Sequence, residues 1–93
     1  MDDLNKFRHE IDTIDETIIR ALAQRFDICK RVAYYKSETG LPMMQPQRIM
    51  EVKERCARLG GKYGVDTKLL NDIYDLIIGQ SCQLEDGIIN ANK

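Results

Sequence analysis

In the first 38 residues, apolar positions recur among polar ones with the period of a helix. Between residues 3 and 38 the chain has neither proline nor glycine, and apolar residues recur every three or four positions. These apolar positions, called the apolar stripe below, are Leu4, Phe7, Ile11, Ile14, Ile18, Ala21, Ile28, Val32 and Tyr35. A stripe kept over five heptads predicts one long helix with a coiled-coil face. The same pattern also fits a protruding coiled-coil arm that carries no binding site.

Two further helices are predicted downstream. One should begin at Pro46, because proline suits the first helical position, and should end before Gly60 and Gly61. Its inward residues would be Ile49, Val52, Cys56 and Leu59. Another should follow Asp66 as N-cap and continue to about Asn90. Its inward residues would be Leu70, Ile73, Ile77, Leu84 and Ile88.

No stretch shows the alternating, β-branched pattern of a strand, so the fold class is predicted to be all-α, with a long-short-long order of three helices. Ninety-three residues suit one domain, spanning residues 1–93, and are too few for two separate cores. A first helix of this length would extend for about 54 Å, whereas a compact globule of this size is about 32 Å across. We therefore expect an intertwined homodimer, in which part of the apolar stripe packs on a second copy.

Composition narrows the classes of function. Lys+Arg 14 against Asp+Glu 15 gives a formal net charge of -1, which argues against a nucleic-acid partner. No apolar run is long enough to span a membrane, and the polar N-terminus lacks a signal-peptide pattern, so a cytoplasmic location is expected. The three cysteines, Cys29, Cys56 and Cys82, lack metal-ligand spacing and fit free thiols. With His9 as the single histidine, no metal site is predicted.

Charged residues at unusual positions indicate a site for a small anion. Arg25 falls on a seam position of the first helix and has no acidic residue three or four positions away. Lys36 lies eleven residues further on, on nearly the same face. Arg48 would lie in the first turn of the second helix, where the helix dipole disfavours a cation unless an anion binds nearby. Ser81 and Glu85 are spaced i, i+4 on the expected inner side of the third helix.

Each of these residues also has an ordinary structural interpretation. Arg25 could extend to solvent or pair with a carboxylate of another helix. Ser81 and Glu85 could belong to a solvated helix end.

Several stretches together resemble the all-α chorismate mutase family, over nearly the full chain. They are residues 7–15, residues 22–25, residues 32–36, the loop from Pro42 to Arg48, and residues 76–78 followed by Ser81. The resemblance implies a homodimer of three-helix protomers and a cofactor-free enzyme, an isomerase that converts chorismate to prephenate in aromatic amino acid biosynthesis. Such a rearrangement is accelerated by holding a flexible dianion in a reactive shape and placing positive charge near its ether oxygen.

The resemblance also implies roles for individual residues. Arg25, Lys36 and Glu85 would be catalytic, with Lys36 and Glu85 near the ether oxygen. The implied substrate-binding residues are Arg8, Arg25, Lys36, Gln45, Arg48, Ile49, Ser81 and Glu85. The resemblance implies that Arg8 comes from the other chain. Helix geometry is consistent with that sharing, since Arg8 lies seventeen residues, about 25 Å, from Arg25 along one helix.

Three positions depart from the pattern of the family. Position 85 is Glu where many bacterial members have Gln, so it can donate to the ether oxygen only when protonated. Position 45 is Gln where Asp is common, and Ile49 replaces a Glu that accepts from the ring hydroxyl. We take chorismate mutase as the first interpretation, with 4-amino-4-deoxychorismate mutase and isochorismate pyruvate lyase as alternatives on the same fold. A helical dimerisation or regulatory module is the alternative without catalysis.

Overall fold

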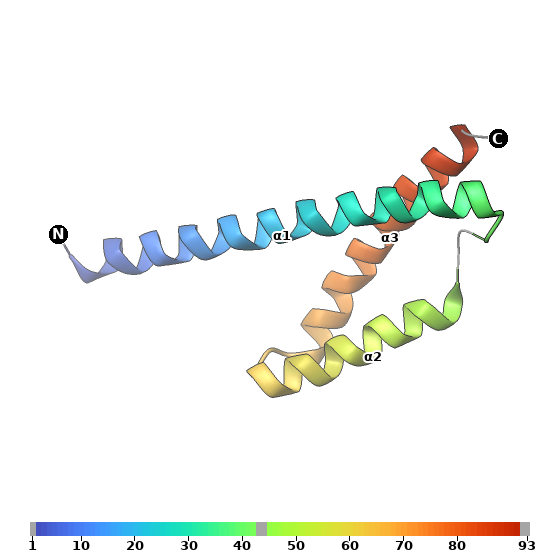
Figure 1. Ribbon diagram of the computed structural model, residues 1–93. Helices are drawn as coiled ribbons and strands as arrows, with labels where there is room; N and C mark the ends of the chain where they lie inside the picture. Colours follow the sequence, from blue (N-terminus) through green and yellow to red (C-terminus); the bar gives the residue numbers. More distant parts are fainter. Residues whose placement is uncertain (1, 43–44, 92–93) are drawn as a thin grey trace.

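The computed structural model describes residues 2–42 and 45–91, and it contains three helices (Figure 1). They are α1, Asp3–Thr39; α2, Pro46–Tyr63; and α3, Thr67–Ala91. The described residues include no strand, which confirms the prediction of an all-α, long-short-long chain.

The long helix α1 forms because nothing within it interrupts the backbone. At its start, the carboxylate of Asp2 accepts a hydrogen bond from the backbone N–H of Asn5 at 2.9 Å, which caps the helix. At its end, Gly40 adopts a left-handed conformation with φ 74°, and its N–H donates to the carbonyl of Lys36. The predicted extent of this helix is therefore confirmed.

The predicted end of α2 is wrong. The helix starts at Pro46 as expected but continues through Gly60 and Gly61, and it ends only at Gly64, whose φ is 72°. Gly60 serves close packing instead of termination, because a Cβ there would collide with the Leu70 side chain. The left-handed turn lies four residues later, at Gly64.

The start of α3 agrees with its prediction. The Asp66 carboxylate accepts from the backbone N–H of Leu69 at 2.9 Å, so Asp66 caps the helix. Val52 and Cys56 are buried as predicted for α2, whereas Leu59 and Ile73 are more than one third exposed. Their inward placement is therefore wrong within one chain.

Within the described residues, the helices pack on one another through α3, which contacts both α1 and α2. Figure 1 shows α3 crossing the C-terminal half of α1, while the N-terminal half of α1 projects away from the other helices. On α1, which α3 contacts, the half-buried or buried residues are Leu22, Arg25, Phe26, Cys29, Ala33, Lys36 and Ser37. This face lies beside the apolar stripe, whose members remain exposed from Leu4 to Ile18 and again at Ile28, Val32 and Tyr35.

The protomer consequently has a very small core. Among the described residues, the buried apolar side chains are Ala33, Val52 and Cys56. No described helix combines the length and apolarity needed to cross a membrane.

Candidate active site

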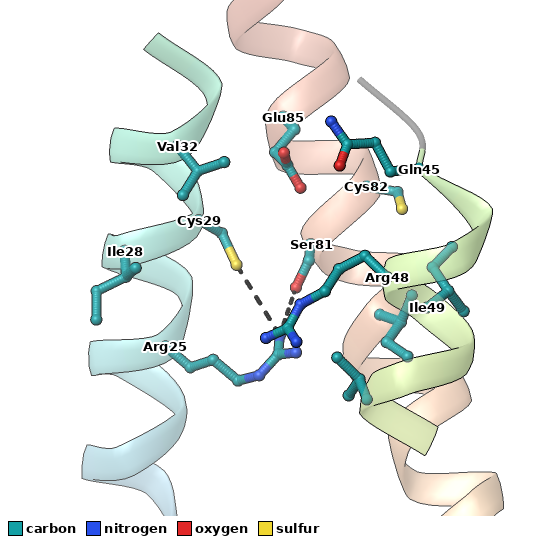
Figure 2. A pocket seen from close by; sticks show the side chains of 12 residues that line it. Arg25, Ile28, Cys29, Val32, Gln45, Arg48, Ile49, Ser81, Cys82 and Glu85 are labelled. Carbon is teal, nitrogen blue, oxygen red and sulfur yellow. Dashed lines mark hydrogen bonds between the residues drawn. The ribbon is translucent and has the colours of Figure 1, made fainter. Parts of the chain in front are cut away.

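A cavity of about 290 Å³ lies among the three helices, at the level where α3 crosses α1. Figure 2 shows side chains of all three helices around it. Its lining residues are Arg25, Ile28, Cys29, Val32, Gln45, Arg48, Ile49, Val52, Ile78, Ser81, Cys82 and Glu85. Six of the eight predicted site residues therefore line one cavity, which we call the anion pocket, although they come from three separate segments of the chain.

Arg25 extends from α1 into the anion pocket. Its Nη1 donates a hydrogen bond to Ser81 Oγ at 2.9 Å and lies 3.9 Å from Cys29 Sγ (Figure 2). Ser81 is 6% exposed, and its hydroxyl donates to the backbone carbonyl of Ile77, so its oxygen is oriented to accept from Arg25. Within the described part of the chain, no carboxylate lies at ion-pair distance from Arg25. The guanidinium thus neither extends to solvent nor pairs with an acid of another helix.

Lys36 and Glu85 form an ion pair across the interface of α1 and α3. The Lys36 Nζ lies 2.8 Å from Glu85 Oε1, and the side chains are only 13% and 11% exposed. Glu85 lines the anion pocket, whereas Lys36 is not among its lining residues. The resemblance implied that both residues lie near the ether oxygen, and the structure adds that the Glu85 carboxylate holds the Lys36 ammonium.

The first turn of α2 supplies the third side of the pocket. The backbone carbonyl of Gln45 accepts from the N–H of Arg48 at 2.9 Å, while the side chain of Gln45 makes no capping hydrogen bond. Figure 2 shows Arg48 extending from α2 toward the guanidinium of Arg25. Arg48 has a loose ion pair with Glu51, at 3.6 Å, with both side chains more than half exposed. Such a pair contributes little, so Arg48 can turn toward an anion at low cost.

Arg8 is the predicted site residue that the protomer does not bring to the pocket. It lies on the exposed N-terminal part of α1 and is absent from the pocket lining. Its assignment to a second copy therefore stays a prediction.

Sequence reasoning missed two cysteines and several apolar residues of the pocket wall. Cys29 and Val32 could have been found, because they lie four and seven residues after Arg25 and so share its helix face. Cys82 follows Ser81 directly, and burial raises the pKa of its thiol. The charge of Glu85 and the neighbouring Cys29 also raise that pKa, whereas Lys36 opposes the rise.

The pocket thus combines cations with an apolar wall. Arg25 and Arg48 present hydrogen-bond donors, while the remaining wall is formed largely by branched aliphatic side chains of Ile28, Val32, Ile49, Val52 and Ile78. Guanidinium groups bind carboxylates through paired hydrogen bonds, and an aliphatic wall suits a hydrocarbon ring. The arrangement is suited to a small cyclic compound that carries carboxylates.

Known proteins match this chain over most of its length. The 4-amino-4-deoxychorismate mutase of Streptomyces venezuelae is 39% identical over 91 residues, which cover 98% of this chain and 88% of the relative. The protein of the same name from Streptomyces pristinaespiralis is 40% identical over 85 residues, with 91% and 66% covered. The chorismate mutase of Methanocaldococcus jannaschii is 29% identical over 82 residues, with 88% and 83% covered. The family model described as chorismate mutase type II matches residues 7–86. The chain therefore belongs to the chorismate mutase type II family of isomerases.

Proposed function

We propose that this chain rearranges 4-amino-4-deoxychorismate to 4-amino-4-deoxyprephenate. The observation that carries the proposal is Ile49, an aliphatic residue in the wall of the anion pocket at the position where a glutamate would accept from the ring hydroxyl of chorismate. A pocket without that acceptor loses its discrimination in favour of a hydroxyl. The two Streptomyces relatives carrying the name 4-amino-4-deoxychorismate mutase support the same substrate. Their support reverses the order of our first interpretation, which put chorismate ahead.

The proposed mechanism is electrostatic. The substrate breaks one C–O bond and forms one C–C bond within the same molecule, so no group or electron pair leaves it. Arg25 and Arg48, together with Arg8 of a second copy, would bind the two carboxylates and hold the flexible side chain over the ring. Glu85, with the Lys36 ammonium beside it, would face the ether oxygen, which gains negative charge as its bond to the ring breaks. Ser81 would keep the Arg25 guanidinium in place through the 2.9 Å hydrogen bond.

We further propose that a second copy of the chain completes each site with its Arg8. The protomer exposes 7345 Å², roughly a third more than the about 5,500 Å² typical of a compact monomer of its mass. The excess surface is apolar over the N-terminal half of α1, where Phe7, Ile11 and Ile14 are each more than half exposed. Pairing of two α1 helices would cover these residues and place Arg8 of one chain beside the anion pocket of the other.

Chorismate is the second candidate substrate. The Methanocaldococcus jannaschii relative is named chorismate mutase, and the carboxylates of chorismate would meet the same two arginines. Isochorismate, the substrate of the lyase alternative, would instead release pyruvate.

A comparison of three substrates tests the proposal. Purified protein is incubated separately with 4-amino-4-deoxychorismate, chorismate and isochorismate, and the products are identified by liquid chromatography and mass spectrometry. We expect a kcat/KM for the amino compound at least as high as that for chorismate, because a pocket without an acceptor for the ring hydroxyl has no means of favouring the hydroxyl compound. A preference for chorismate, or release of pyruvate from isochorismate, would contradict the proposal.

A pair of arginine variants provides the control. Arg25→Ala should abolish turnover, whereas Arg20→Ala should not, because the Arg20 side chain on the same helix is 71% exposed and pairs with Glu16 on the surface. Retained activity in Arg25→Ala would contradict the proposed site.

A further inference from the structure

An aromatic ring stands behind the guanidinium of Arg25. The Cζ atom of Arg25 lies 5.9 Å from the centroid of the Tyr74 ring, within the range of a cation–π interaction. Tyr74 is on α3, two turns before Ser81, and residues at this spacing share a helix face. Tyr74 does not line the anion pocket; it lines two smaller cavities, of about 160 and about 30 Å³, between α2 and α3. It therefore contacts Arg25 without lining the anion pocket.

The choice of an aromatic partner has an electrostatic consequence. A carboxylate beside Arg25 would neutralise the guanidinium and compete with a substrate carboxylate for its N–H groups. The face of an aromatic ring attracts the cation but offers no lone-pair oxygen, so the charge remains available. This fits the observation that, in the described residues, the contacts of Arg25 are the ring, the Ser81 hydroxyl and the Cys29 sulfur.

The ring is itself held by α2. Burial raises the pKa of the Tyr74 phenol above its ordinary value of 10.0, and a hydrogen bond with the thiol of Cys56 raises it further. The charges of Arg25 and Arg55 act in the opposite direction. Cys56 is 6% exposed and lies in the middle of α2. Cys56, Tyr74 and Arg25 thus form a chain of contacts from α2 through α3 to α1.

We propose that Tyr74 is a positioning residue, whose ring sets the direction of the Arg25 guanidinium toward a substrate carboxylate. The inference rests on the proposed function only in requiring that Arg25 bind substrate. It assigns to the contact between α2 and α3 a role in substrate binding, although Tyr74 itself touches no substrate.

Three variants separate positioning from general stability. Tyr74→Phe keeps the ring and removes the phenol, Tyr74→Leu removes the ring, and Leu70→Ala loosens the same cavities between α2 and α3 without touching Arg25. We expect kcat/KM to fall about tenfold in Tyr74→Leu, in line with the loss of one cation–π contact. We expect a change of less than about threefold in Tyr74→Phe and in Leu70→Ala, because both keep the ring over the guanidinium. Thermal melting of each variant identifies any loss of stability.

A loss in Tyr74→Leu no larger than in Leu70→Ala at equal melting temperature would overturn the inference. An equal loss in Tyr74→Phe and Tyr74→Leu would also overturn it, because the hydroxyl and not the ring would then be responsible. Activity is measured with both 4-amino-4-deoxychorismate and chorismate, so a wrong substrate assignment leaves this comparison intact.

A measurement without substrate keeps the inference testable if neither compound is turned over. The side-chain Nε–H resonance of Arg25 is assigned by its disappearance in Arg25→Lys. A ring-current shift of that resonance should persist in Tyr74→Phe and vanish in Tyr74→Leu. An unchanged resonance in Tyr74→Leu would refute the contact on which the inference depends.

Discussion

Two inactive variants are expected to restore activity when they are mixed, because Arg8 and Arg25 are proposed to serve one site from two chains. On a single α1 helix the two residues are seventeen positions apart, which corresponds to about 25 Å and is too far for one small substrate. Arg8→Ala removes the contribution of a chain to the site of its partner. Arg25→Ala removes its contribution to its own site. Each homodimer then has two defective sites, but a mixed dimer has one site with both defects and one site with none.

The size of the effect follows from this arrangement. Random exchange of equal amounts of the two variants makes half of the dimers mixed, and each mixed dimer has one intact site of two. The recovered activity should therefore be about a quarter of that of the wild type. The variants are mixed in mild denaturant, returned to buffer and assayed by product formation, with dimer content followed by light scattering.

Arg25→Ala mixed with Lys36→Ala provides the matched control. Both residues belong to the same chain of a site, since α1 carries both and both contact α3. Every site of their mixed dimer lacks one of the two, so no activity should return. Recovery in this control, no recovery in the Arg8 and Arg25 mixture, or full activity of Arg8→Ala alone would refute the shared site.

Four other substitutions have expected outcomes. Glu85→Gln should raise kcat/KM, because an amide can donate to the ether oxygen and a carboxylate cannot, and an unchanged or lower kcat/KM would contradict that role. Cys82→Ser should reduce the loss of folding stability above pH 9. Burial raises the pKa of this thiol from its ordinary value of 9.0, so the thiol's contribution to stability is complete below pH 9 and is lost as the pH rises through the folded-state pKa. The urea unfolding midpoints of both proteins are compared at pH 8 and above pH 10, and an equal fall of the midpoint in both proteins would exclude this thiol as a cause. Gly60→Ala should destabilise the protein by about 1–3 kcal/mol through overpacking, since a Cβ would meet Leu70 and lie 3.0 Å from the Val65 carbonyl. Gly61→Ala has open space around it and should stabilise the protein by about 0.5–1 kcal/mol. Urea unfolding measures both free energies, and a Gly60→Ala variant more stable than Gly61→Ala would refute the packing argument.

The helices could be predicted from local signals because their ends are set by neighbouring residues. Asp66 caps α3 with its own side chain, and Gly40 ends α1 with its own backbone conformation. The end of α2 was missed because Gly60 is needed for close packing against Leu70, ten residues away. A glycine needed for close approach and a glycine needed for a turn have the same letter in the sequence.

The site was predictable in its charged residues and not in their partners. Arg25 was conspicuous because a cation on an apolar seam has no local explanation. Tyr74 was not, because an aromatic residue on an inner helix face has an ordinary explanation in packing. Its contact with Arg25 depends on the crossing of α1 and α3, and no spacing along the chain encodes that crossing.

The unbroken course of α1 also limits how the chain can change in length. Arg8, Arg25 and Lys36 lie on one rigid rod of 37 residues. A single residue inserted between Arg8 and Arg25 would turn one relative to the other by about 100°. Seven inserted residues would keep the face but move Arg8 by about 10 Å along the axis. Insertions should therefore be tolerated in the connections between helices and rejected throughout α1, even at positions where every single substitution is harmless.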